Sequence, residues 1–210
     1  VMALPEDEVS WDGSYVIFAT ASGGVRRNKL SDFTKVNANG KIAMKLDEGD
    51  RLVRVRVFDE DKNVFLATRK GKCVRFPVTD VRVFSSRNST GVRGIRLVDD
   101  DEVIAMSGLN HIKVEVAERD DYLRSVNAAR RLLNGDYTDR SEDKDRDETA
   151  AERLNEPLFQ EMQQEEEFIL TVTIDGFGKR SSAYGYRISK RGGKGIDSMD
   201  VKRGKELTEV

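Results

Sequence analysis

Apolar and polar residues are arranged in three stretches of the chain in a way that predicts β-hairpins. Each stretch has an apolar run ending in Thr, then two residues and a Gly, then a second strand: "YVIFATASGGVRRNKLSDF" from Tyr15, "NVFLATRKGKCVRFPVTDV" from Asn63 and "FILTVTIDGFGKRSSAYGY" from Phe168. Strand-forming runs around a tight turn, with Gly where positive φ is needed, are typical of a hairpin. The sequence therefore predicts one hairpin repeated three times.

A second glycine-centred element follows each hairpin. The elements "VNANGKIAMKL", "SSRNSTGVRGIRL" and "ISKRGGKGIDSM" come 17 to 20 residues after the turn glycine. After the first two of them, an acidic turn leads into another apolar strand, as in "DEGDRLVRVRVF" and "VDDDEVIAM". About four strands in every 40–50 residues is the pattern of propeller-like arrays. We therefore expect an all-β fold, a β-pinwheel or propeller-like array of four-stranded blades.

An acidic segment interrupts the array. Thr20 and Thr68 are 48 residues apart, whereas Thr68 and Thr173 are 105 apart, and the excess of 57 matches residues 107–167. We expect two blades in residues 1–106, a helical, partly disordered insertion in 107–167, and a third blade, incomplete at its C-terminal end, in 168–210.

The insertion has its own internal pattern. Residues 119–133 predict an amphipathic helix that packs an apolar face on a blade; this face comprises Tyr122, Leu123, Val126 and Leu133. Residues 135–148 contain almost no apolar side chains and predict disorder. Residues 149–167 predict a second helix that breaks or restarts at Pro157. An alternative role for this acidic segment is to mimic a polyanionic ligand and to compete with it for binding to the rest of the chain.

Charge is distributed unevenly along the chain. Residues 107–167 hold 9 Lys and Arg against 17 Asp and Glu, a net charge of −8, while the remainder carries +6. The repeats therefore form a mildly basic body, although the whole chain has a net charge of −2. We assign the aromatic residues of the repeats to the core rather than to base stacking: Trp11, Phe18, Phe65, Phe76 and Phe84.

Several kinds of chemistry are disfavoured. One cysteine, Cys73, and one histidine, His111, cannot form an internal disulfide, a cysteine-based zinc site or a histidine pair. We interpret His111 as incidental. The stretch "GGKG" lacks the Lys-Ser/Thr ending of a P-loop, and "GFGKRS" lacks the third glycine of a dinucleotide fingerprint. No paired carboxylates, catalytic triad or metal cluster can be assembled, so we expect no active site and no metal.

Cations recur at equivalent positions of the repeats and predict a basic rim. Phosphate contacts from such a rim supply affinity for duplex DNA without reading its bases. The candidate DNA-binding residues are Arg26, Arg27, Lys29, Lys41, Arg69, Lys70, Lys72, Arg75, Arg87, Arg93, Arg96, Lys179, Arg180, Lys190, Arg191 and Lys194. Within "KRGGKG", the glycines would let the backbone approach phosphates closely; this loop comprises Lys190, Arg191, Gly192, Gly193, Lys194 and Gly195.

The repeat and "STGVRGIRL" (89–97) together resemble the C-terminal domain of the DNA gyrase A protein, a β-pinwheel that wraps DNA. "VIFATASGGVRR", "GKIAMKL", "GKCVRF" and "GFGKRS" are similar to successive blades of that domain. The resemblance implies about three consecutive blades cut from a larger ring. "KRGGKG" resembles the gyrase A box except that Ser189 stands where the box has Gln, so we interpret residues 190–195 as a box-like loop of a later blade.

The resemblance also implies a function. It predicts a module that wraps or bends double-stranded DNA, largely independently of sequence, and supports ATP-dependent negative supercoiling by a bacterial, cytoplasmic type II topoisomerase. The partners would be the rest of the gyrase A protein and the gyrase B protein, with ATP and magnesium bound elsewhere in the holoenzyme and no cofactor or cleavage tyrosine in this chain. The alternatives are the C-terminal domain of the corresponding A protein of topoisomerase IV and a non-catalytic propeller scaffold for protein partners.

Overall fold

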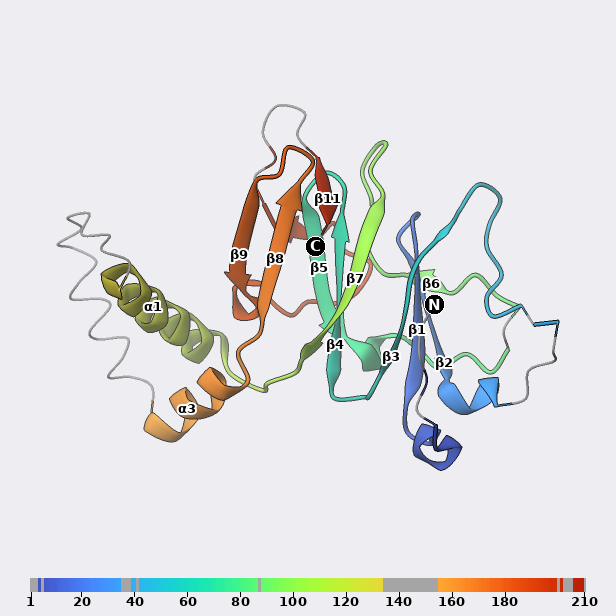
Figure 1. Cartoon of the computed structure of the whole chain (residues 1–210), viewed down its shortest axis with the longest axis horizontal. Coiled ribbons are helices and arrows are strands. Elements are labelled where there is room, and N and C mark those ends of the chain that lie inside the picture. Colours follow the sequence, from blue (N-terminus) through green and yellow to red (C-terminus); the bar gives the residue numbers. More distant parts are fainter. Residues whose placement is uncertain are drawn as a thin grey trace. The chain divides into compact units, whose positions relative to one another are not determined.

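The chain forms two compact units (Figure 1). A computed structural model describes residues 4, 6–34, 39–40, 42–86, 88–133, 155–199, 201 and 206–209. The sheet unit comprises residues 1–111, 169–181 and 186–210, and the helical unit comprises Ile112–Phe168 and Ser182–Gly185. None of the helices in the described part of the chain combines the length and apolar character required to span a bilayer.

The sheet unit is built from three small sheets. Sheet 1 has the strand order β3-β1-β2-β6, sheet 2 has the order β10-β5-β4-β7, and sheet 3 has the order β11-β8-β9. The paired strands of sheets 1 and 2 are antiparallel. The strands are β1 (Tyr15–Thr20), β2 (Gly24–Lys29), β3 (Leu52–Phe58), β4 (Lys62–Thr68), β5 (Lys72–Pro77), β6 (Val92–Arg93), β7 (Val103–Asn110), β8 (Phe168–Thr173), β9 (Gly178–Ser182), β10 (Ile196–Asp197) and β11 (Leu207–Glu209). Short 3-10 helices are η1 (Glu8–Trp11), η2 (Leu30–Phe33), η3 (Val78–Asp80) and η4 (Ala183–Gly185).

The repeated threonine closes each hairpin turn. Thr20 Oγ1 accepts a hydrogen bond from Gly24 N at 3.1 Å, and the threonines of the other two hairpins accept equivalent bonds at 3.1 and 3.2 Å. The turn glycine has positive φ, +86° at Gly23, and its N–H donates to the threonine carbonyl at 3.0 Å. The Thr-x-x-Gly pattern is therefore a turn motif whose side chain satisfies a backbone donor.

Sheets 1 and 2 each have four strands, and in each of them the fourth strand comes from the following repeat. Strand β6 pairs with β2, and β10 pairs with β5. The carbonyl of Gly23 accepts from Gly94 N at 2.8 Å, and that of Gly71 accepts from Ser198 N at 2.8 Å. The second glycine-centred element of one repeat therefore fastens that repeat to the preceding hairpin.

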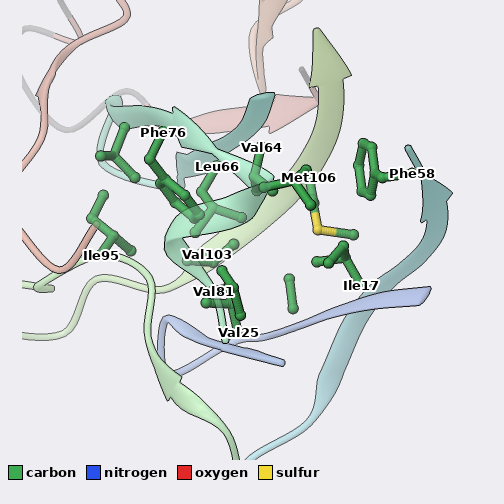
Figure 2. Close-up of a cluster of buried hydrophobic side chains, with 13 residues drawn as sticks. Ile17, Val25, Phe58, Val64, Leu66, Phe76, Val81, Ile95, Val103 and Met106 are labelled. Atoms are coloured by element: carbon green, nitrogen blue, oxygen red, sulfur yellow. The ribbon is translucent and has the colours of Figure 1, made fainter. Parts of the chain in front are cut away.

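The main hydrophobic core lies between sheets 1 and 2 (Figure 2). Ile17 and Val25 of sheet 1 pack toward Leu66, Val103 and Met106 of sheet 2, all at most 2% exposed. Burying side chains of this size contributes about 1.5–3 kcal/mol each. The prediction of buried aromatic residues is confirmed, because the following are at most 7% exposed: Trp11, Phe18, Phe65, Phe76 and Phe84.

The helical unit contains helices α1 (Val116–Leu133) and α3 (Glu156–Gln164). Its core joins Tyr122 of α1 and Met162 of α3 to Tyr184 of η4, and the Tyr184 hydroxyl donates to the Met162 carbonyl at 3.1 Å. Pro157 lies in the first turn of α3, where it starts the helix as predicted. Leu133 is 86% exposed, so its predicted place in the packed face is wrong.

The boundaries of the insertion differ from those expected. Strand β7 continues to Asn110, so residues 107–110 belong to sheet 2. Residues Ser182–Gly185 of the third repeat belong to the helical unit. The described chain is β-rich with two α-helices, and both helices lie in the segment predicted as a helical insertion. The predicted disorder of 135–148, and residues 149–154 of the predicted second helix, lie outside the described residues.

Gly91 offers a test of the close contact between repeats. It has a φ of +95°, and a Cβ there would overlap the carbonyl oxygen of Val25. Gly91→Ala should lower the free energy of unfolding by about 1–2 kcal/mol from the backbone conformation and by a further ~1–3 kcal/mol from overpacking. Urea denaturation measures the change.

Gly40 is the matched control, because it occupies the equivalent position of the first repeat. Its φ is +79°, but apart from its chain neighbours no atom of the described residues lies within 4 Å of the position a Cβ would take. Gly40→Ala should therefore show only the conformational cost of about 1–2 kcal/mol. Equal losses in the two variants would contradict the contact.

Candidate nucleic-acid interface

Arg26 and Arg27 were expected on the surface, but they are 0% and 3% exposed. Arg26 Nε donates to Asn28 Oδ1 at 2.8 Å, and its guanidinium group lies 5.2 Å from the centre of the Phe84 ring. The guanidinium group of Arg27 pairs with Glu60. Because protein groups surround both side chains, neither can contact a phosphate in this fold. Their assignment to a DNA-binding surface is wrong.

Arg75 is also buried, at 3% exposure, and belongs to a polar network. One guanidinium nitrogen donates to the Asn110 carbonyl at 2.7 Å. With the Asn63 amide oriented to suit its neighbours, its oxygen accepts from Arg75 at 3.0 and 3.1 Å and its nitrogen donates to His111 Nδ1 at 2.8 Å. Arg75 therefore stabilises sheet 2 instead of binding DNA. His111 is part of this network rather than incidental.

Arg69 takes part in a chain of ion pairs across the repeats. Glu102 pairs with Arg51 at 2.7 Å and accepts from Arg69 Nε at 2.8 Å. Arg69 also lies 3.7 Å from a carboxylate oxygen of Glu206. The hydrogen bond from Arg69 holds the pKa of Glu102 below its usual range. These carboxylates neutralise Arg69, which makes it a weak candidate for a phosphate contact.

The remaining candidate cations reach the surface. Lys72 is half-buried and pairs with Asp197 at 2.6 Å. The residues with exposed side chains are Lys29, Lys70, Arg93, Arg96, Lys179, Arg180, Lys190 and Lys194. Lys41 and Arg87 lie outside the described residues. The sequence therefore named most of the surface cations of the repeats, although it also included three that are buried.

The box-like loop, residues 190–195, is attached to the second repeat. Gly192 N donates to the Gly94 carbonyl at 2.5 Å, and the Gly193 carbonyl accepts from Arg96 N at 2.8 Å. Arg191 donates from Nε to the Asp80 carbonyl at 2.9 Å, and from a terminal nitrogen to the Arg93 carbonyl at 3.0 Å. Arg191 therefore fastens the loop, while Lys190 and Lys194 face solvent.

A cleft of about 250 Å³ lies where three segments of the sheet unit meet. Cations line it from the β4–β5 hairpin, from the segment after β6 and from the box-like loop: Lys70, Lys72, Arg96 and Lys194. Ile95, Leu97 and Val98 supply apolar surface, and Asp99 and Asp101 supply carboxylates. The fold thus gathers predicted cations that are far apart in sequence.

Two exposed arginines of β3 were missed as candidates. Arg54 and Arg56 alternate with the partly buried Val53, Val55 and Val57 along this strand. The period-2 pattern of "LVRVRVF" indicated that one face of the strand is basic and exposed. This basic face was not predicted, because β3 lies outside the hairpins from which the candidate cations were taken.

These features define a β-rich module of repeated antiparallel sheets, in which each complete sheet takes a strand from the following repeat and the surface carries clustered cations. The chain belongs to the family described as DNA gyrase C-terminal domain, beta-propeller, which matches residues 14–59, 62–110 and 167–207. The resemblance inferred from the repeat is therefore confirmed. Residues 111–166, most of the insertion, lie outside the matched segments.

Similar proteins include the DNA gyrase A proteins of several bacteria. The chain is 50% identical over 201 residues to that of Rickettsia bellii (strain RML369-C), and 49% identical over 208 residues to that of Granulibacter bethesdensis (strain ATCC BAA-1260 / CGDNIH1). Each match covers 96% of the chain but 22% of the relative. The chain therefore spans about a fifth of the length of these proteins.

Two solved structures share the fold. A structure of the DNA gyrase A C-terminal domain matches with a TM-score of 0.59 and 21% identity, covering 95% of this chain and 50% of that one. The C-terminal domain of DNA topoisomerase IV also matches with a TM-score of 0.59, at 16% identity, covering 93% of this chain and 45% of that one. At these identities the likeness concerns the fold alone.

Arg191 should matter for stability more than its neighbour Lys190. Arg191→Ala removes the donors to two backbone carbonyls, and hydrogen bonds from charged groups contribute about 1.5 kcal/mol at the low end. For a protein of this size that corresponds to a thermal midpoint lower by about 3–6 °C. Lys190→Ala, in the same loop but exposed, should leave the midpoint within about 1 °C. Calorimetry that finds equal midpoints for the two variants would exclude the fastening role.

Glu102 should give the stability of the sheet unit a dependence on pH. Its pKa is lower in the folded chain than its ordinary value of 4.5, chiefly because of Arg69, so its contribution is present above pH 4.5 and is lost as pH falls through the lower folded pKa. Glu102→Gln should cost about 0.5–1 kcal/mol at pH 7, as expected for a partly exposed pair. This difference should shrink in acid, as measured by urea denaturation. Asp100→Asn, at an exposed neighbouring carboxylate, should show no such loss at neutral pH.

Proposed function

We propose that the chain is a DNA-binding and DNA-bending module of a gyrase A protein. The observation that carries this proposal is the cluster of exposed cations that different repeats contribute to one cleft: Lys70, Arg96 and Lys194. Cations held on a rigid framework of sheets can follow a phosphate backbone without contacting base edges. The binding is therefore largely independent of sequence.

Bending follows from the spacing of such contacts. Several phosphates bound around a curved array repay the elastic cost of bending, which is about 1–6 kcal/mol for a site of 20–30 base pairs. In the parent protein this module presents a neighbouring DNA segment to the strand-passage region, so that the two segments cross with a fixed handedness. It thereby supports negative supercoiling that is driven by ATP bound elsewhere, with magnesium, in a holoenzyme of gyrase A and gyrase B proteins.

A further blade of the parent chain completes the array in this proposal. Leu170 of β8 is 58% exposed, whereas Ile17 and Phe65, which occupy the equivalent position in the first two hairpins, are 0% and 1% exposed. Burying an exposed leucine favours association by about 1.5–3 kcal/mol. Sheet 3 therefore meets another blade through this face, within a closed pinwheel.

Salt titration of duplex binding tests the function. The 210-residue chain is mixed with a fluorescent duplex, and affinity is measured by anisotropy as salt increases. Each neutralised phosphate lowers log K by ~0.9 per tenfold increase in salt, so roughly six contacts predict a loss of about three orders of magnitude between about 50 and 200 mM salt. A second duplex of equal length and unrelated sequence should bind with similar affinity.

Energy transfer between dyes at the duplex ends tests bending in the same samples. The ends should come closer together upon binding. A nearly flat salt response would overturn the DNA-binding role and favour a scaffold for protein partners. Salt-dependent binding without a change in energy transfer would retain binding but remove bending, as expected of a module that holds DNA without wrapping it.

A further inference from the structure

The lining of the cleft carries a net positive charge, because four cations face two carboxylates there. Among the described residues, Lys70, Arg96 and Lys194 form no ion pair through their side chains, whereas Lys72 pairs with Asp197. Like charges that converge on one hollow disfavour each other, and an anion between them relieves the repulsion. The unpaired charge therefore indicates an anion-binding site.

The carboxylates of the cleft offset these cations only in part, and among the described residues neither forms an ion pair with them. Asp101 Oδ1 accepts from the backbone nitrogens of Lys70 and Glu102, each at 2.9 Å, so it serves to shape the turn. Asp99 lies on the cleft wall in a left-handed conformation, with a φ of +50°. The side-chain hydroxyl of Thr68 accepts from Lys72 N at 3.1 Å and likewise supports the turn. The turns around the cleft are thus held by these bonds, and among the four cationic side chains Lys72 is the one engaged, with Asp197.

The site exists only when two repeats are joined. Lys70 belongs to the second hairpin, whereas Lys194 belongs to the glycine-centred element of the third repeat. The two segments are held together by Ser198, whose N–H and hydroxyl donate to the Gly71 carbonyl at 2.8 and 3.0 Å. Anything that binds both lysines must therefore favour the joined arrangement.

We propose that this cleft binds one phosphate group, and that its occupation clamps the third repeat onto the second. This proposal rests on the proposed function, in which the natural source of the phosphate group is the backbone of duplex DNA. An open surface cleft lined by cations from three segments suits a phosphodiester, because each phosphate brings one negative charge to a lining with more cations than carboxylates. DNA binding and the cohesion of the array are then a single linked equilibrium.

Lys194 and Lys190 provide a matched pair to test the site. Both are exposed lysines of the box-like loop, but only Lys194 lines the cleft. Lys194→Ala should reduce the slope of log K against log salt by about 0.9. The ratio of the affinities of the unaltered chain and the variant should therefore change about three- to fourfold between about 50 and 200 mM salt. Lys190→Ala should reduce the slope clearly less. Equal effects of the two substitutions, with duplex binding intact in the parent, would overturn the cleft while retaining the proposed function. Absence of duplex binding in the unaltered chain would instead overturn the proposed function.

Cys73 provides an independent readout of the clamp. Its side chain is 0% exposed and belongs to β5, the strand that pairs with β10, so a thiol reagent reaches it only when the structure around these strands opens. Duplex DNA should slow labelling of Cys73 by a factor comparable to the loss of affinity caused by Lys194→Ala, and this protection should disappear in that variant. Labelling that is unaffected by DNA would overturn the clamp.

Inorganic phosphate distinguishes the two sources of the group. If millimolar phosphate alone slows Cys73 labelling as much as the duplex, and does so only when Lys194 is present, the site binds free phosphate and the DNA source is wrong. If only the duplex protects, the phosphodiester source is supported. Protection by either anion that persists in Lys194→Ala would overturn the cleft as the site.

Discussion

The structure depends on one recurring hydrogen bond, the one that the carbonyls of the turn glycines Gly23 and Gly71 accept from the next repeat. Gly23 and Gly71 turn their hairpins with positive φ, and a Cβ at either position would lie 2.8 Å from a backbone oxygen of the following repeat. The same residue therefore makes the turn and leaves room for the neighbouring chain. Without this contact, β6 and β10 would lose one of the bonds that join them to the preceding sheets, and an isolated hairpin is only marginally stable.

Local chemistry explains why so much of this fold could be predicted from the sequence. The threonine, the turn glycine and the acidic turn each act within a few residues or on the adjacent turn; Asp50, for example, accepts from Ser22 N at 3.0 Å. Such features recur unchanged wherever their residues recur. The helix containing Tyr122 was predictable for the same reason, since its period is contained in its own sequence.

The fate of the arginines could not be predicted in this way. Arg27, Arg75 and Arg180 occupy the same position of three hairpins, yet the first two are buried and the third is exposed. Burial there depends on acceptors outside the hairpin, such as Glu60 for Arg27 and the Asn110 carbonyl for Arg75. A repeat specifies which side chain a strand carries, but its surroundings decide whether that charge meets solvent. The same limitation applies to η4, because Tyr184 joins the helical core through contacts made far from its own hairpin.

The way that strands are shared between repeats also determines how easily the chain accommodates an insertion. In sheet 1 the shared strand pairs Gly24 with Arg93, whereas in sheet 2 the corresponding pairing joins Lys72 to Asp197 across a chain segment that includes the whole insertion. The entropy of closing a loop grows only with the logarithm of its length, so lengthening this connection from 69 to 125 residues costs about 0.5 kcal/mol. One well-made strand pairing offsets that amount. A polymer chain that already closes long loops in order to complete its sheets can therefore acquire a folded unit between repeats at almost no thermodynamic cost.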